Sequence, residues 1–237
     1  THLIQRLQRE PWLPIPLSRP FGTSSPPINF VADHMPFVVG ITGGVGSGKS
    51  TAASCLKKHG AVVVDADEIS RTLTKNGSPV IAEISQAFGA QILHADGSLN
   101  RSALAALVFS DSKALEKLNA IMHPKIRMEA IRQIEACAID QIVVYDMPLL
   151  IETDSVALCD VVIVVDLDTK EQIERLVKNR GMSHEEAEAR IRTQATREQR
   201  NLVATWVIDN SKTTKECEQE CASVWLGIVE RAIEARS

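Results

Sequence analysis

The chain has 237 residues, of which 44% are hydrophobic and 24% are charged, and its formal net charge is −4. This composition is typical of a globular protein with one sizeable core and an inserted subdomain. The negative balance argues against a protein that coats nucleic acid, because such proteins usually carry a basic surplus. No apolar run in the sequence approaches the roughly 20 residues that a membrane span needs. We therefore expect neither nucleic acid nor membrane as a partner.

The five cysteines show neither CxxC pairs nor a dense framework. This usage favours a reducing compartment, and we expect a cytoplasmic protein. Cys217 and Cys221 share a helix face, but no histidine or second pair completes a metal site, so we expect a structural role for them.

Residues 1–36 differ in composition from the rest, since seven of the ten prolines lie between Pro11 and Pro36. Such a composition favours extended, poorly packed backbone. The prolines interrupt the apolar region that a secretory signal needs, and a mitochondrial presequence would be a more regular basic helix. We expect a flexible leader, either a natural extension or a remnant of cloning ahead of Met35.

Five short apolar runs follow from Phe37 onward: FVVGIT, AVVVDAD, QIVVYDMP, DVVIVVDLD and TWVIDN. They are mostly apolar on both faces, which is typical of parallel strands that lie between helix layers. The sequence therefore predicts an α/β fold with a doubly wound, parallel five-stranded sheet.

Two long segments without strand signals interrupt this pattern. Residues 68–140 contain separate helical patterns such as SKALEKLNAIM and PKIRMEAIRQIEACA, and an excursion of that size usually covers the carboxyl ends of strands, where ligands bind. Residues 169–204 contain six arginines, most of which a solvated pair of charged helices would explain. We expect a core from residues 37–67, 141–168 and 205–237, a helical acceptor domain from 68–140 and a helical lid from 169–204.

The stretch FVVGITGGVGSGKST ends in a glycine-rich turn that is followed by a lysine and two hydroxyls. GGVGSGKS matches the pattern GxxxxGK[ST] between a predicted strand and a predicted helix, which makes the signal strong. Glycines let backbone N–H groups and the helix amino end meet phosphate oxygens without obstruction by side chains. We expect this glycine loop to bind ATP through Gly43, Gly44, Val45, Gly46, Ser47, Gly48, Lys49, Ser50 and Thr51.

Two side chains of the glycine loop have chemistry of their own. Lys49 is expected to place a positive charge on the β and γ phosphates, and the Ser50 hydroxyl can bind Mg²⁺. The loop also occurs in switches and motors, so it does not by itself name the reaction. The sequence lacks the NKxD and DxxG motifs of GTPases and the signature of ABC-type ATPases. It offers what a small-molecule kinase needs: a strand-end carboxylate, a lid with arginines and a region for the acceptor.

Acidic residues follow several of the predicted strands. Asp65 and Asp67 are two residues apart after the second strand, so an extended backbone would project both to the same side. One could accept the proton of an attacking hydroxyl while the other orients it, although either could instead cap the next helix. Asp146 and Asp166 resemble Walker-B acids, but strand ends often carry polar residues that have no part in chemistry.

Together these motifs resemble the dephospho-coenzyme A kinase family over Phe37 to Ala235. The matching stretches are TGGVGSGKST, VVDADEISR, LHADGSLNRSALAALVF, IMHPKIR, DMPLLIE, VVIVVDLDTKEQIERL, RIRTQATREQR and VIDNS. The resemblance implies a P-loop kinase fold and transfer of the ATP γ-phosphate to the ribose 3′-hydroxyl of dephospho-coenzyme A, with Mg²⁺. ATP and dephospho-coenzyme A would be the partners of a monomer or weak homo-oligomer.

The resemblance also implies roles for single residues. Asp67 would be the base that activates the hydroxyl, Lys49 would bind the phosphates, and Arg175 would bridge the transferring phosphoryl group. A positive charge at Arg175 is physically reasonable, because negative charge on the equatorial oxygens of the transferring phosphoryl group must be stabilised. The acceptor pocket would include Asp65, Asp96, Asn100, Arg101, His123, Arg127 and Glu152. His123, directly before Pro124, could equally pack at a helix start.

One departure from the family lies in the lid, where members often have an arginine followed by an aspartate. Here Asn179 precedes Arg180 and Gly181, so the arginine is displaced by one residue and turned by about 100° on a helix. Arg180 could still take the place of the family's second lid arginine if the preceding helix ends before residue 180. Arg190 has no implied role, and we expect it to matter less than Arg175.

Two other interpretations stay open. One is another small-molecule kinase of the adenylate-kinase-like group, against which the long acceptor region argues, because it is bulkier than a nucleoside monophosphate requires. The other is a nucleotide-dependent binding or switch protein. Turnover of dephospho-coenzyme A in the presence of Mg-ATP would exclude it.

Deleting residues 1–34 should leave the Tm and the turnover nearly unchanged, because a proline-rich segment without a periodic apolar face buries little surface. Thermal unfolding and steady-state rates of the full and shortened chains check this. A large fall in Tm would mean that the leader packs against the rest of the protein.

Overall fold

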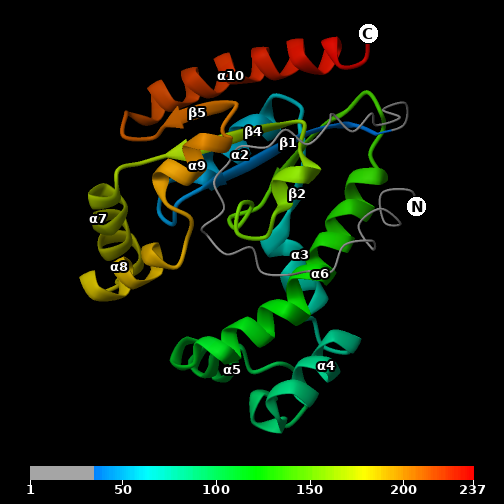
Figure 1. The fold of residues 1–237 in the computed structure, drawn as a ribbon, viewed down its shortest axis with the longest axis vertical. Helices are drawn as coiled ribbons and strands as arrows, with labels where there is room; N and C mark the ends of the chain where they lie inside the picture. The colour runs from blue at the N-terminus through cyan, green and yellow to red at the C-terminus, as the bar shows by residue number, and fades with distance from the viewer. Residues whose placement is uncertain (1–34) are drawn as a thin grey trace, which may run out of the picture. The chain divides into compact units, whose positions relative to one another are not determined.

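The computed structural model describes residues 35–237, apart from the side chains of Phe109 and Thr214. The predicted leader thus lies outside the described residues except for its last two positions. Five parallel strands form one sheet in the order β2-β3-β1-β4-β5, which confirms the predicted sheet (Figure 1). The strands are β1 (Phe37–Gly43), β2 (Val62–Asp65), β3 (Ile142–Asp146), β4 (Val161–Asp166) and β5 (Trp206–Asp209).

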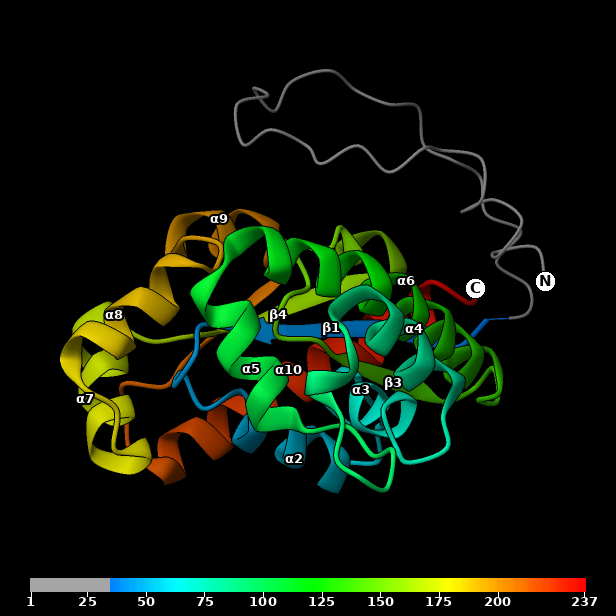
Figure 2. The ribbon, with the colours of Figure 1, turned by 90° about the horizontal axis from the view of Figure 1, so that it is seen from below.

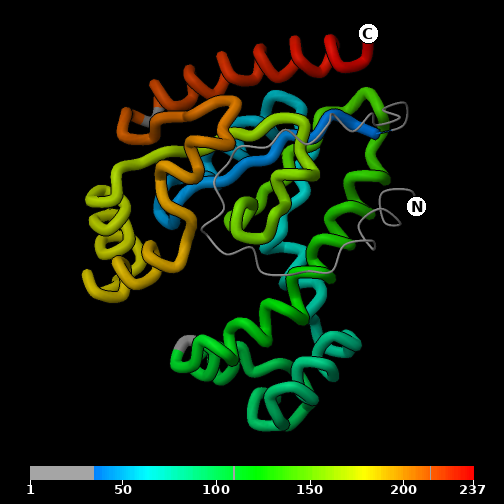
Figure 3. The backbone as a smooth tube through the Cα atoms, viewed as in Figure 1, coloured from blue at the N-terminus to red at the C-terminus, as the bar shows by residue number. Residues whose placement is uncertain are grey.

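Helices connect the strands and cover the sheet. They are α2 (Lys49–Lys58), α3 (Ala66–Leu73), α4 (Pro79–Phe88), α5 (Arg101–Ser110), α6 (Ser112–Glu135), α7 (Thr169–Arg180), α8 (His184–Arg192), α9 (Arg197–Val203) and α10 (Thr214–Glu234), with short 3-10 helices η1 (Ala90–Ile92) and η2 (Ser155–Leu158). Figure 3 follows the chain from β2 through α3, α4, α5 and α6 before it returns to the sheet at β3.

Both faces of the sheet are buried, because successive strand residues point to opposite sides. Val39 and Ile163 belong to a core that includes residues of α2 and α10. Val38 and Val143 belong to a second core that includes residues of α6 and α3. Figure 2 shows α2 and α10 on one side of β1 and β4, and α9 on the other. Burial on both faces explains why the strands are continuous apolar runs in the sequence.

Helix α6 is longer than the sequence patterns indicate. SKALEKLNAIM and PKIRMEAIRQIEACA suggested two helices, but one helix spans Ser112–Glu135 with Pro124 inside it. An internal proline removes a backbone hydrogen bond and typically costs about 3 kcal/mol. Burial of a stripe with four-residue spacing offsets this cost; the stripe consists of Met122, Ile126, Ala130 and Ile134. The expectation of separate helices was therefore wrong.

The order of the strands places a ligand site at the end of β1. The chain passes from β1 to the edge strand β2 and back to β3, and then crosses to β4 on the other side of β1. Loops after β1, β3 and β4 therefore diverge at the carboxyl end of the sheet, where doubly wound folds bind ligands. The glycine loop, residues 43–51, starts there.

Gly40 in the middle of β1 has no room for a side chain. An added Cβ would lie 2.6 Å from Sγ of Cys159 and 3.0 Å from Cδ2 of Leu150. Both neighbours belong to the connection between β3 and β4, so this connection packs directly on the strand. We expect Gly40→Ala to destabilise the protein by about 1–3 kcal/mol through overpacking.

This change should lower the Tm by about 2–4 °C per kcal/mol in a chain of this size. Thermal unfolding of Gly40→Ala, Cys159→Ala and the double variant checks it. The double variant should recover part of the loss, because it removes the nearest obstructing atom. An unchanged Tm in Gly40→Ala would contradict the packing described.

Candidate active site

The glycine loop connects β1 to α2 through left-handed backbone. Gly46 and Gly48 have φ angles of 80° and 89°, which residues with side chains rarely adopt. A Cβ on Gly48 would also clash with Nδ2 of Asn210, which donates a hydrogen bond to the Ser47 carbonyl at 2.6 Å. The loop after β5 thus fixes the glycine loop from the side. The N–H groups of Val45 and Ser47 are already bonded, to Gln194 and to the Gly44 carbonyl, so phosphate oxygens would meet other N–H groups of this bare backbone.

Lys49 and Asp146 form an ion pair at the carboxyl end of the sheet. The Asp146 side chain is 9% exposed, and its pKa is raised, chiefly by burial, although the neighbouring Lys49 acts to lower it. The carboxylates of Asp65 and Asp67 contribute to the same rise in pKa, because like charges disfavour ionisation. One ammonium and three carboxyl groups therefore interact beside the glycine loop, and Asp146 is the acid nearest to Lys49.

The two acidic residues after β2 differ in their surroundings. Asp65 ends the strand and caps α3, accepting hydrogen bonds from the N–H groups of Asp67 and Glu68 at 2.8 and 3.1 Å. Because this cap starts the helix at Ala66, Asp67 lies in a helical turn and not on extended backbone. The expectation that an extended strand projects both side chains to one side was therefore wrong.

A cleft with a volume of ≈ 1000 Å³ opens beside the glycine loop. Its walls come from α3, α6, the segment after β3, the lid helices α7 and α8, and the loop after β5. Asp67 is part of this lining, whereas Asp65 is absent from it among the described residues. The volume is at the upper end of the range for small-molecule sites, which leaves room for a nucleotide and a second substrate.

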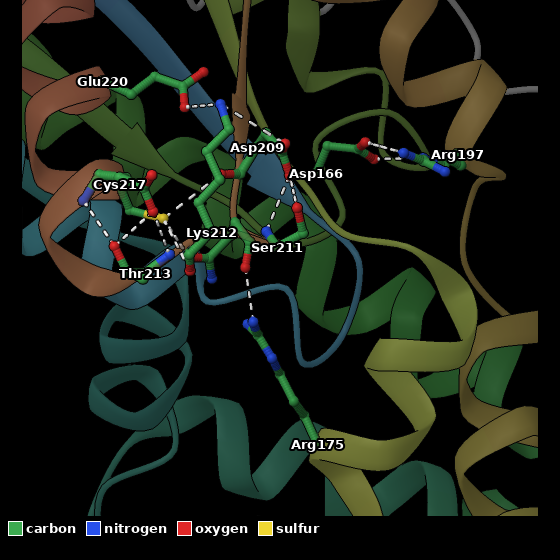
Figure 4. A network of polar contacts seen from close by, with 11 residues as sticks. Asp166, Arg175, Arg197, Asp209, Ser211, Lys212, Thr213, Cys217 and Glu220 are labelled. Atoms are coloured by element: carbon green, nitrogen blue, oxygen red, sulfur yellow. Dashed lines mark hydrogen bonds and ion pairs between the residues drawn. The ribbon is translucent and has the colours of Figure 1, made fainter.

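Three lid arginines, Arg175, Arg180 and Arg190, line the cleft. Nη2 of Arg175 donates a hydrogen bond to the carbonyl oxygen of Asn210 at 2.7 Å, and Figure 4 shows its side chain extended from α7 toward the loop after β5. Arg180 is the last residue of α7, directly before the left-handed Gly181. Arg180 thus reaches the cleft although the helix continues to that residue. Arg190 also lines the cleft, and the expectation that it matters less than Arg175 stays a prediction.

The remaining lid arginines contact protein groups. Arg197 forms a bidentate ion pair with Asp166, with Nη2 and Oδ2 2.6 Å apart (Figure 4). Asp166 therefore connects α9 to the end of β4, as a polar strand-end residue would. Arg192 pairs with Glu188 at 3.5 Å on the exposed face of α8, as expected for a solvated helix. Arg200 is buried.

Among the residues expected in the acceptor pocket, His123 lines the cleft. It lies inside α6, which continues through Pro124, so the alternative of a residue packed at a helix start was wrong. Burial lowers the pKa of His123. This shift favours the neutral imidazole, which can donate one hydrogen bond and accept another.

Three other expected acceptor residues lie around the start of α5 and have local contacts. Asp96 accepts a hydrogen bond from the Ser98 hydroxyl at 2.6 Å, which lowers the pKa of Asp96. Asn100 caps α5, and Nη2 of Arg101 donates to Oγ1 of Thr74 at 2.8 Å. None of the three belongs to the described lining of the cleft, and their part in acceptor binding stays a prediction.

Arg127 and Glu152 connect segments of the protein to one another. Nη1 of the buried Arg127 donates to the Asp154 carbonyl at 3.2 Å, which ties α6 to the segment before η2. Oε1 of Glu152 accepts a hydrogen bond from the backbone N–H of Ala195 at 2.7 Å, which ties the β3–β4 connection to the lid. Their roles toward the acceptor also stay predictions.

Three uncharged polar residues near the glycine loop were not singled out from the sequence. Asn210 contacts the glycine loop from the segment directly after β5, and Gln194 accepts a hydrogen bond from the Val45 N–H at 2.8 Å. Gln172 is 1% exposed and donates to the Leu167 carbonyl at 2.7 Å. All three lie in stretches that carried the family resemblance, VVIVVDLDTKEQIERL, RIRTQATREQR and VIDNS, but nothing in the residue type alone distinguishes them.

Two further observations bear on the setting of the protein. All five cysteines are free thiols, and burial raises the pKa of the Cys159 thiol to about 12. None of the described helices combines the length and apolar character that crossing a bilayer requires.

Comparison with known proteins relates the site to a family. Residues 37–216 match the family model described as dephospho-CoA kinase. A relative named dephospho-CoA kinase from Thermobifida fusca (strain YX) is 47% identical over 187 residues, which cover 79% of this chain and 94% of the relative. A relative of the same name from Streptomyces avermitilis is 44% identical over 195 residues, covering 82% of this chain and 95% of the relative.

The fold has solved counterparts as well. The crystal structure of a Thermus thermophilus protein matches with a TM-score of 0.69 and 33% sequence identity, covering 81% of this chain and 97% of that chain. The matched family model includes the glycine loop, Asp67 and the three cleft-lining arginines. The chain therefore belongs to the dephospho-CoA kinase family.

Proposed function

We propose that this chain transfers the γ-phosphate of ATP to the ribose 3′-hydroxyl of dephospho-coenzyme A, giving coenzyme A and ADP in the final step of coenzyme A biosynthesis. The observation that carries the proposal is one cleft that joins the glycine loop, Asp67 and three lid arginines. The names of relatives that are 44% and 47% identical support the choice of acceptor.

The glycine loop and the amino end of α2 form the ATP side of the cleft. Their backbone N–H groups and the positive end of the helix would bind the β and γ phosphates. The ion pair with Asp146 already directs the Lys49 ammonium to the end of the sheet. Phosphate oxygens would compete with Asp146 for this ammonium and so fix the triphosphate beside Asp67.

Asp67 is the proposed general base. It is exposed in the first turn of α3 and lines the cleft, so an entering hydroxyl can reach its carboxylate. Asp146 is a weaker candidate because it is nearly buried and already paired with Lys49. A carboxylate that takes the proton as the phosphorus–oxygen bond forms prevents positive charge from building on the acceptor oxygen.

The lid arginines would stabilise the phosphoryl group during transfer. Phosphoryl transfer has little covalent chemistry for a protein to perform, so positioned positive charge supplies most of the catalysis. Arg175 is favoured because its guanidinium is held by the Asn210 carbonyl next to the glycine loop. Arg180 and Arg190 reach the same cleft from the end of α7 and from α8.

Mg²⁺ fits the oxygen donors on this side of the cleft. The Ser50 hydroxyl lines the cleft next to Lys49, and the Asp146 and Asp67 carboxylates interact nearby. Mg²⁺ usually takes one or two protein oxygens together with substrate phosphates and water, so Ser50 with one of these acids would hold it. When bound, the ion neutralises charge on the β and γ oxygens.

The acceptor would lie against α6, which forms part of the wall of the same cleft. Leu118, Met122 and Ile126 give this wall apolar surface, and Asn119 and His123 give it polar groups. Such a surface suits a ligand that combines an adenine ring with a long pantetheine chain. We include in the proposal the division into core, acceptor domain and lid, and a cytoplasmic location, which the free thiols support.

The direct test measures ADP release from Mg-ATP with dephospho-coenzyme A, against a panel of nucleosides, nucleoside monophosphates and pantetheine compounds. We expect turnover on dephospho-coenzyme A at least about a hundredfold above the panel, as a site that hydrogen-bonds its substrate permits, with the new phosphate at the 3′ position by ³¹P NMR. Preferred turnover on a nucleoside monophosphate would instead support an adenylate-kinase-like activity.

Asp67→Asn should lower kcat on the order of 10²-fold or more and leave the affinity for ATP within a few-fold, because it removes the base but keeps the size of the side chain. Glu68→Gln is the matched control, since Glu68 is exposed in the same helical turn and neutralises one charge at the same helix end. Steady-state kinetics and ATP titration check both variants. Equal losses in binding and turnover for Asp67→Asn would point to a Mg²⁺ or structural role.

Arg175→Ala should lower kcat by about 10²- to 10³-fold with little change in either KM, because the charge is needed mainly while the phosphoryl group moves. Arg175→Lys should restore only part of the rate, since an ammonium cannot replace a planar fork. Arg192→Ala is the control on the same lid, because Arg192 is exposed and paired with Glu188. Equal losses in the Arg175 and Arg192 variants would mean that the lid acts as a diffuse basic surface.

A further inference from the structure

The lid contacts the glycine loop through a side chain that the proposed mechanism does not use. Gln194, two residues after α8, accepts a hydrogen bond from the backbone N–H of Val45 through Oε1 at 2.8 Å. Both residues line the cleft. The bond joins segments that are 149 residues apart in the sequence, one that would bind phosphate and one that carries the arginines.

The backbone on either side of Gln194 is fixed. Its own N–H donates to the Ile191 carbonyl at 3.1 Å and continues the last turn of α8. The N–H of Ala195 donates to Glu152 at 2.7 Å, and the Ala195 carbonyl accepts a hydrogen bond from the buried Arg200 at 2.6 Å. The carboxamide is therefore directed at the loop by a backbone that is already ordered, which limits the entropy lost in making the contact.

The glycine loop also packs directly against this part of the lid. A Cβ on Gly44 would lie 2.5 Å from Oε1 of Gln172 and 3.0 Å from Nη2 of Arg200. Arg200 thus touches the loop with one part of its guanidinium and the Ala195 backbone with another. A displacement of the segment around Gln194 would break these contacts together with the hydrogen bond to Val45.

We propose that Gln194 is a positioning residue that fixes the lid on the glycine loop and so places the three lid arginines over the transferring phosphoryl group. A carboxamide suits this position because it accepts the Val45 N–H without adding negative charge beside the phosphates. The kinetic consequence rests on the proposed function. The contact itself is measurable without any substrate.

The first readout is hydrogen exchange at the Val45 amide, followed by NMR in the full chain without substrates. Gln194→Ala should speed this exchange about tenfold, the equivalent of one net hydrogen bond. Gln194→Glu should keep the exchange within about twofold of the original chain, because a carboxylate accepts the same N–H. Gln199→Ala is the matched control, since Gln199 also accepts a backbone hydrogen bond within the lid but lies in the capping box of α9.

The second readout is the split between kcat and KM. Gln194→Ala should lower kcat about tenfold with the KM for ATP within threefold, because the arginines act mainly in the transition state. Gln194→Glu should instead raise the KM for ATP about tenfold, since its charge would repel the triphosphate. Gln199→Ala should change neither constant more than about twofold, whatever its effect on Tm.

Unchanged Val45 exchange in Gln194→Ala would overturn the proposal, as would a loss of kcat in Gln199→Ala equal to that in Gln194→Ala. If the original chain does not phosphorylate dephospho-coenzyme A, the proposed function fails. Hydrogen exchange at Val45 still tests the contact with Gln194 in that case, because the measurement requires no substrate.

Discussion

Bare backbone at the end of β1 is the constraint on which the rest of the site depends. Cβ positions on Gly43, Gly44 and Gly48 are each approached to 2.6 Å or closer by other groups of the protein. These groups come from β4, α7 and the loop after β5, as well as from the glycine loop itself. The glycines that leave N–H groups open to phosphate thus also let three distant segments meet around one turn. A side chain at any of these positions would displace at least one of the groups that now contact the glycine loop.

The topology of the sheet brings further residues of the proposed active site to this meeting point. Because β1 lies between β3 and β4 and the strands are parallel, the carboxyl ends of all three lie at the same edge of the sheet. β2 leads to Asp67, β3 ends in Asp146 beside Lys49, and β4 ends in Asp166, which secures α9 through Arg197. Asp67 and the three arginines Arg175, Arg180 and Arg190 line one cleft beside the glycine loop.

The sequence predicted the five strands and the glycine loop, because each has a pattern with a physical cause: buried strands are apolar, and phosphate needs bare backbone. The role of Asp67 came from the family resemblance and stays a prediction, and the expectation of extended backbone there was wrong because Asp67 lies in a helical turn. Pro124 led to the wrong expectation of a break between two helices. Its local cost in free energy is outweighed by burial of an apolar stripe on α6, which only the packed structure shows. Asn210 and Gln194 were missed for a related reason. An amide side chain acquires its function from the backbone group it meets, and those groups are 163 and 149 residues away.

The central claim is that Asp67 receives the proton of the acceptor hydroxyl while Lys49 turns to phosphate. A crystal structure with a non-hydrolysable ATP analogue, Mg²⁺ and dephospho-coenzyme A tests it most directly. We expect the ribose 3′-oxygen at about 2.6–3.2 Å from the Asp67 carboxylate, in line with the γ-phosphorus, and the Lys49 ammonium on phosphate oxygens. A 3′-oxygen bound instead to Asp146, or directed away from the glycine loop, would contradict the account.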